Sequence, residues 1–119
     1  MKPEKFVRAI RSELIDDLVN QYADLFTSND LNDFKDKEMH SLARLWKMAD
    51  SDTRDLLKLF IRLGSQNSIS SFLGILDNVS KLKIPHQDLQ LNEIDGTILN
   101  GDLLDIFWEQ EEEAGNVNQ

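Results

Sequence analysis

The sequence contains no cysteine, and it has only two prolines and five glycines among its 119 residues. Without cysteine there can be no disulfide, no thiolate nucleophile and no cysteine-ligated zinc. The few glycines do not form the phosphate-binding loop of nucleotide-binding folds. The apolar runs are far shorter than the roughly 18 residues that a membrane-spanning helix needs. No apolar stretch of a signal peptide follows the charged N-terminus, so we expect a cytoplasmic protein.

Basic residues are missing from the last part of the chain, and this absence accounts for the formal net charge of −9. Residues 1–87 contain all 13 Lys and Arg and an equal number of Asp and Glu, whereas residues 88–119 contain only acidic charges. Such a segment disfavours nucleic acid and anionic membranes, since both are bound through Lys and Arg. It favours a basic protein as partner, or it serves only to keep the chain soluble. The predicted partner-binding residues are Asp88, Glu93, Asp95, Asp102, Asp105 and Glu109, and Glu111, Glu112 and Glu113 extend them.

Apolar residues recur at steps of three and four through most of the first 80 positions, which predicts amphipathic helices. The third of these helices is almost continuously apolar, so we expect it at the centre of the domain or in an interface. Gly64 is expected to end it, and Gly74 in the fourth helix is expected to allow close approach of a neighbouring helix. The expected helices span residues 3–26, 33–49, 52–63 and about 68–80, and Asp50-Ser51-Asp52 is expected to offer the N-cap of the third.

The pattern changes after Pro85. Residues 88–92 alternate polar and apolar, and an Asp-Gly turn at Asp95 precedes a short apolar stretch, which predicts a β-hairpin. Asp102 is expected to cap a closing helix over residues 103–111. The predicted fold is mainly α (α+β), with a four-helix core, a small C-terminal β-hairpin and a short closing helix. We expect a single domain over residues 1–111 and a flexible acidic tail over residues 112–119.

Residue patterns for catalysis or metal binding are weak. His40 and His86 do not stand at the spacing of a zinc or di-iron motif. The loop around Gly96 places that glycine as a calcium loop would, but Leu91 then takes the first ligand position and cannot bind calcium. We therefore expect no catalytic, cofactor-binding or metal-binding residues, and no enzyme.

A basic stripe recurs on the third expected helix. Arg54, Lys58 and Arg62 stand at helical spacing and form its one polar face. They are able to bind an anion or an acidic partner, or to pair with the acidic part of the same chain. The favoured interpretation is a solvated or internally paired face.

The second half of the chain resembles a group of small uncharacterised bacterial proteins. The resemblance rests on Ser-Ile-Ser-Ser-Phe-Leu-Gly-Ile-Leu-Asp-Asn-Val at 68–79, on Leu-Gln-Leu at 89–91 and on Asn-Gly-Asp-Leu-Leu-Asp-Ile-Phe at 100–107. In that group a helix ending in Leu-Asp-Gly-Val leads to a hairpin and a short closing helix ending in Asp-x-Phe. Asn78 stands here where glycine is usual. The resemblance implies a bacterial origin and a hairpin, and it carries no activity and no functional residue.

Three functions follow as hypotheses. The first is a small bacterial cytoplasmic protein-binding module, for example an immunity or antitoxin-like protein, that uses the acidic C-terminal surface. The second is a structural or oligomeric accessory protein that associates through the apolar helix at 52–63, for example as a homodimer. The third, favoured least, is a carboxylate-based metal protein or enzyme.

Overall fold

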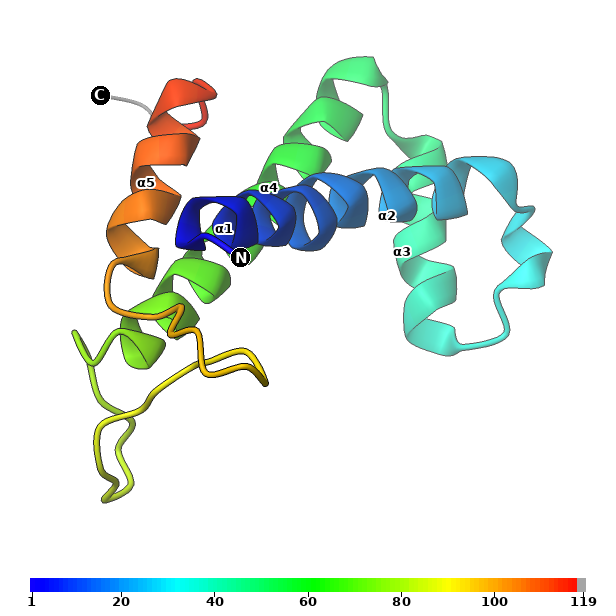
Figure 1. The fold of residues 1–119 in the computed structure, drawn as a ribbon. Helices are drawn as coiled ribbons and strands as arrows, with labels where there is room; N and C mark the ends of the chain where they lie inside the picture. The colour runs from blue at the N-terminus through cyan, green and yellow to red at the C-terminus, as the bar shows by residue number, and fades with distance from the viewer. Residues whose placement is uncertain (118–119) are drawn as a thin grey trace.

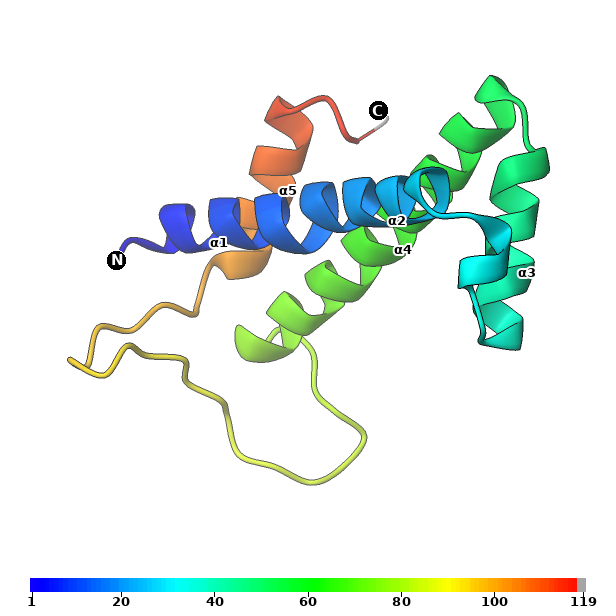
Figure 2. The same ribbon diagram turned by 90° about the vertical axis from the view of Figure 1, so that its right-hand side faces the viewer.

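Two long helical rods cross in the computed structural model, which describes residues 1–117 (Figure 1). The first rod is continuous and contains one π-helical turn, and the second rod is a single α-helix. A shorter helix lies at each end of the crossed pair, α3 at one end and α5 at the other (Figures 1 and 2). The elements are α1 (Pro3–Arg11), the π turn η1 (Ser12–Asp16), α2 (Asp17–Ser28), the 3-10 turn η2 (Leu31–Asp33), α3 (Lys37–Met48), α4 (Ser51–Leu76) and α5 (Leu103–Glu113).

The helix starts follow from local sequence. Pro3 occupies the first turn of α1, where a missing backbone N–H has no consequence. The Asp36 side chain accepts a hydrogen bond of 2.9 Å from the Met39 N–H at the start of α3. The Asp50 side chain accepts one of 2.7 Å from the Thr53 N–H at the start of α4. These are N-caps, which satisfy otherwise unpaired amide groups. The predicted first helix and the predicted cap near Asp50 are confirmed.

The third and fourth predicted helices are one helix, so the prediction that Gly64 ends a helix was wrong. A glycine inside a helix costs only about 1 kcal/mol relative to alanine, and its neighbours in α4 supply enough helix-forming residues to continue through it. The helix instead ends at Leu76, and two residues later Asn78 has a left-handed φ of 63°. The Val79 N–H donates to the Gly74 carbonyl at 3.0 Å and the Asn78 N–H to the Ile75 carbonyl at 3.1 Å. This pair of bonds is a Schellman motif, with asparagine in the position that glycine usually takes.

The predicted β-hairpin was also wrong, since residues 1–117 contain no β-strand. The chain does turn at Gly96, but only an isolated antiparallel bridge joins Asn92 to Ile98. The segment 77–102 is therefore a long loop between α4 and α5 (Figure 2). The mainly α part of the prediction is correct, because helices make up 67% of the structure.

Asparagine side chains explain why the hairpin does not form. The Asn78 side chain accepts a hydrogen bond from the Leu89 N–H at 2.8 Å and donates to the Leu89 carbonyl at 3.0 Å. The Asn100 side chain accepts from the Leu91 N–H at 2.8 Å. Backbone groups that a partner strand would have paired are thus satisfied by side chains, which favours an irregular loop.

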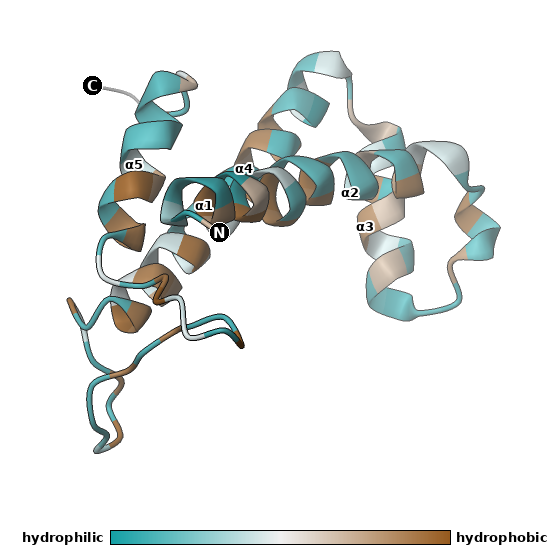
Figure 3. Ribbon diagram, in the orientation of Figure 1, coloured by the Kyte–Doolittle hydropathy of each residue, from teal (hydrophilic) through white to brown (hydrophobic). Residues whose placement is uncertain are grey.

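Helix α5 docks on the C-terminal end of α4. The Asp77 carboxylate accepts hydrogen bonds from the Gly101 N–H at 2.6 Å and the Leu104 N–H at 2.7 Å. Asp102 occupies the N-cap position of α5, as predicted, but its side chain makes no cap hydrogen bond; the carboxylate that caps the helix is that of Asp77. A Cβ at Gly74 would lie 3.4 Å from Leu104 Cδ2, an ordinary van der Waals contact, so α5 does pack beside this glycine but the packing does not require one. The first turns of α5 are apolar and its last turns hydrophilic, as Figure 3 shows.

Buried apolar side chains of the described residues gather in two clusters, one at each end of the rods. The first lies between α1, η1, α4 and α5 and contains Val7, Ile15, Leu73, Leu103 and Phe107. The second lies between α2 and α3 and contains Phe26, Ala43 and Trp46. The radius of gyration is 17.7 Å, against about 13.5 Å for a compact domain of this length. The structure is therefore open, with its cores apart.

The end of α5 is tied into the first core by a buried charge. Glu111 is 0% exposed; its carboxylate accepts hydrogen bonds of 2.7 Å from Arg11 Nε and from Gln66 Nε2. The sequence-based placement of Glu111 among the surface acids was therefore wrong. The flexibility of residues 112–119 stays a prediction, and residues 118–119 lie outside the described part of the chain. No helix within residues 1–117 is long and apolar enough to cross a lipid bilayer.

Candidate protein-binding groove

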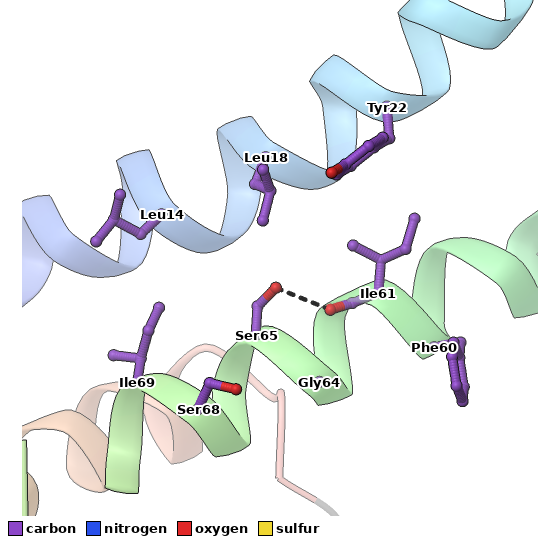
Figure 4. A pocket seen from close by; sticks show the side chains of 9 residues that line it. All are labelled: Leu14, Leu18, Tyr22, Phe60, Ile61, Gly64, Ser65, Ser68 and Ile69. Atoms are coloured by element: carbon purple, nitrogen blue, oxygen red, sulfur yellow. Dashed lines mark hydrogen bonds between the residues drawn. The ribbon is translucent and has the colours of Figure 1, made fainter. Parts of the chain in front are cut away.

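The space between the two cores is an open apolar groove. It consists of two hollows, one of ≈ 500 Å³ between the rods and one of ≈ 460 Å³ between α2, α3 and α4. Tyr22, Phe60 and Ile61 line both, so the hollows are continuous. The first is also lined by Leu14, Leu18, Gly64, Ser65, Ser68 and Ile69 (Figure 4). The second is also lined by Phe26, Met39, Leu42, Leu45, Trp46 and Leu57. We call this continuous surface the apolar groove.

The first rod forms one wall of the groove because it carries two apolar stripes. Ile15 and Val19 are buried, and they belong to the side that faces the rest of the fold. Leu14, Leu18 and Tyr22 recur at steps of four on an adjacent side and face α4 across the hollow (Figure 4). Leu14 stands in the π turn, a departure from regular helix that is frequent at functional sites. A helix with an apolar arc this wide buries only part of it in the monomer.

The groove side chains remain largely in solvent. Phe60 is 78% exposed, and Leu14, Leu42 and Leu45 are each about half exposed, at 50%, 49% and 50%. Phe60 points away from the first rod (Figure 4). It stands between the exposed Leu56 and Leu63 at helical spacing, so the three side chains form a ridge beside the hollows.

Polar chemistry is scarce in the groove. Within residues 1–117, neither hollow is lined by an Asp, Glu, Lys, Arg or His side chain. The Ser65 hydroxyl donates to the Ile61 carbonyl of the same helix at 2.9 Å. The Trp46 Nε1–H donates to the Thr27 hydroxyl at 3.0 Å. The groove therefore lacks the convergent polar and titratable groups that catalysis or recognition of a polar small molecule requires.

The basic stripe on α4 pairs with nearby elements. The Arg54 guanidinium lies 5.1 Å from the centre of the Trp46 ring, a cation–π contact, and Arg54 Nε donates to the Trp46 carbonyl at 2.9 Å. Arg62 forms an ion pair of 2.6 Å with Asp16 of the first rod. Arg54 and Arg62 are therefore paired within the chain, in agreement with the favoured interpretation of the stripe. Their partners come from α3 and η1 and not from the acidic residues at 88–119. Both arginines brace the edges of the groove.

The predicted acidic site is divided by the fold into two groups. Three members lie on the loop, and each has a partner within the chain. Asp88 pairs with Lys81 at 3.1 Å, and Glu93 pairs with the N-terminal amine at 2.7 Å. Hydrogen bonds from the Thr97 backbone N–H and hydroxyl lower the pKa of Asp95.

The second group consists of Asp102, which directly precedes α5, and of two residues on that helix. Asp102, Asp105 and Glu109 are exposed and follow one another at steps of three and four, so they share one face of the helix. Within the described chain, no group of three or more His, Asp or Glu side chains is placed to hold a metal ion. The partner-binding role of all six acidic residues stays a prediction.

Comparison with known proteins supplies no family for this chain. No protein-family model, no curated protein and no solved structure matches it. Function is therefore inferred from the chain's own residues. The sequence pattern of the first rod did contain a signal for the groove, since it has more apolar positions than one buried face needs. Which of these positions face α4 across an open space depends on how the rods cross.

Proposed function

We propose that this chain is a non-enzymatic protein-association module that binds a polypeptide through the apolar groove. The observation that supports this function best is the continuous exposed apolar surface around Phe60, built on two rigid helical rods. Contiguous apolar surface left in solvent is a common mark of an interaction site. This is the oligomeric or accessory role expected from the apolar segment at 52–63.

The energetics favour a polypeptide occupant. Fully burying one Leu or Phe side chain contributes about 1.5–3 kcal/mol. Phe60 is 78% exposed and Leu14, Leu42 and Leu45 are each about half exposed, so covering these four alone contributes roughly 5 kcal/mol before the cost of association. A polar small molecule would find few hydrogen-bonding groups in the groove to fix its orientation.

Site-specific photo-crosslinking in cells that express the chain tests this proposal. Benzoylphenylalanine replaces Phe60 in one protein and Phe72 in a matched control, because Phe72 lies on the same helix and is also exposed but does not line the groove. We expect a covalent adduct to one polypeptide from position 60 and none from position 72. Equal adduct formation at the two positions, or none at position 60, contradicts the proposal.

The acidic face of α5 supports a second candidate function. Asp102, Asp105 and Glu109 present three exposed charges on one side of a helix, which suits a basic protein such as the target of an immunity or antitoxin-like protein. Replacing the three by Asn, Asn and Gln should abolish salt-sensitive binding to basic nuclease domains; unchanged binding contradicts this role. A bacterial origin and a cytoplasmic location accompany this candidate as further proposals.

A further inference from the structure

We infer that the polypeptide that fills the apolar groove is a second copy of this chain, in a two-fold symmetric dimer that places Phe60 of each copy in the hollow of the other. The inference rests on the proposed function and names its partner. Most soluble oligomers are homo-oligomers, and in a two-fold dimer the same patch of both copies forms the interface. Such a patch must contain both a protruding side chain and a hollow that receives the same side chain of the other copy. The apolar groove contains both, because Phe60 protrudes beside the hollow that Gly64 lines.

The surface area of the single chain indicates an uncovered interface. The chain exposes 8502 Å². A compact monomer with a mass of 13.7 kDa exposes about 6,600 Å². The excess is roughly 1,900 Å², whereas a stable interface needs about 800 to 1,000 Å² from each partner. The long loop at 77–102 also contributes to this excess.

Gly64 is an independent sign of a close partner. It lies in the interior of α4, where glycine costs about 1 kcal/mol relative to alanine. Its φ is not left-handed, and no described atom lies within 4 Å of the place that a Cβ would take. Nothing within residues 1–117 therefore requires glycine at this position. It lines the edge of the first hollow, one helical turn after Phe60 and on the same side of α4 (Figure 4), and the missing side chain leaves room for an aromatic ring from another copy.

The ridge and the hollow are placed for mutual insertion. Phe60 precedes Gly64 by one helical turn, so a two-fold axis between them brings the Phe60 ring of each copy over Gly64 of the other. Two copies of α4 then cross along their exposed sides, which carry Leu56 and Leu63 on either side of the ring. An aromatic anchor in a central pocket is the usual form of an interface hot spot.

Electrostatics permit this pairing although each chain has a net charge of −9. The acidic excess lies at residues 88–119, on the loop and α5, at the other end of α4 from α3 (Figure 1). The groove itself has no charged lining residue among the described positions. A two-fold axis near Gly64 places the two loops, which leave α4 after Leu76, at opposite ends of the dimer, whereas the last turn of α5 lies against Gln66 and nearer the axis. Salt screens charges that are further apart than about 8 Å, so the repulsion between the loop acids is small.

Sedimentation equilibrium of the purified full chain tests the inference with four proteins. Phe60→Ser removes the anchor, and Gly64→Leu fills the hollow while keeping a good helix former and adding apolar surface. Phe72→Ser is the control, since it removes an exposed Phe of the same helix outside the groove. Circular dichroism checks that every variant remains helical. Because Phe60→Ser acts twice in a symmetric dimer, we expect the dissociation constant to rise roughly 1,000-fold.

We expect the wild type and Phe72→Ser to sediment at twice the chain mass of 13.7 kDa, and Phe60→Ser and Gly64→Leu at one chain mass. A wild type that stays at one chain mass at the highest soluble concentration overturns the inference. A dimer that survives both groove variants also overturns it, because the copies then meet elsewhere. In either case a crosslink from position 60 to a different polypeptide leaves the proposed function standing, and no crosslink removes both.

Discussion

Replacing Glu111 by Gln should strongly destabilise the fold, because this carboxylate is the buried connection between both rods and α5. It is fully buried, and the side chain of its partner Arg11 is only 13% exposed. One carboxylate oxygen accepts from Arg11 Nε and the other from Gln66 Nε2, both at 2.7 Å. A glutamine keeps the shape but places an NH₂ group against one of these donors and removes the charge that balances the guanidinium.

Breaking a buried ion pair by removing one partner typically costs 3–5 kcal/mol. Arg11 keeps one further hydrogen bond, of 3.2 Å, to the Gln110 side-chain oxygen, so we expect the lower end, about 3 kcal/mol. For a domain of this size that loss lowers the melting temperature by roughly 10–15 °C. The matched control is Glu113→Gln, which removes the same charge from an exposed position on the same helix.

Urea denaturation followed by circular dichroism measures both variants in the Phe60→Ser background, where stability does not depend on protein concentration. A difference of less than about 0.5 kcal/mol between Glu111→Gln and Glu113→Gln would refute the reasoning, since surface substitutions have effects of that size. Replacing the pair together, as Arg11→Met with Glu111→Leu, should recover most of the loss because no buried charge is then left alone.

Three further predictions use the same denaturation assay. Phe107 is fully buried against Trp108, so Phe107→Ala should cost about 3–5 kcal/mol, and a loss below about 1 kcal/mol would contradict this core. Gly64→Ala should stabilise the Phe60→Ser protein by about 1 kcal/mol through helix propensity. Destabilisation would show that the fold of the single chain requires glycine at this position. Hydrogen bonds from the Thr53 hydroxyl and backbone N–H lower the pKa of Asp50 below its ordinary value of 3.8. The ionised cap thus adds stability above pH 3.8 that is lost as pH falls through the folded-state pKa, and Asp50→Ala should lack this acid-dependent loss.

The helices could be predicted from the sequence because their signals are local. Apolar spacing predicts the first rod, and Asp50 predicts the start of α4. The end of α4 was misplaced because a glycine predicts a helix end only where the next residues cannot continue the helix. At Gly64 they can, and the left-handed residue that follows the helix end is Asn78.

The errors on the loop and on α5 have a common cause in long-range contacts. Whether residues 88–99 form strands depends on what pairs with their backbone, and the Asn78 and Asn100 side chains do so from outside the segment. The burial of Glu111 depends on Arg11, which is 100 residues away in the sequence. No local pattern separates this glutamate from its exposed neighbours.

The groove could be predicted only in part. The apolar character of residues 52–63 indicates a central position or an interface, and the structure shows that its middle lies in solvent around Phe60. Which apolar stripe of the first rod is covered depends on the crossing of the rods and on the separation of the cores. Both are properties of the whole fold, since the same spacing of apolar residues fits a fully covered helix.

The most direct test of the central claim is isotope-filtered NOE spectroscopy on a mixture of ¹³C-labelled and unlabelled chains. This measurement detects only contacts between two copies of the chain. It therefore shows both whether a second copy occupies the groove and which of its residues lie there. We predict cross-peaks between the ring protons of Phe60 in one copy and the Hα protons of Gly64 or the methyl protons of Leu63 in the other. The absence of intermolecular cross-peaks from Phe60, or their restriction to residues outside the groove such as Phe72, would contradict the account.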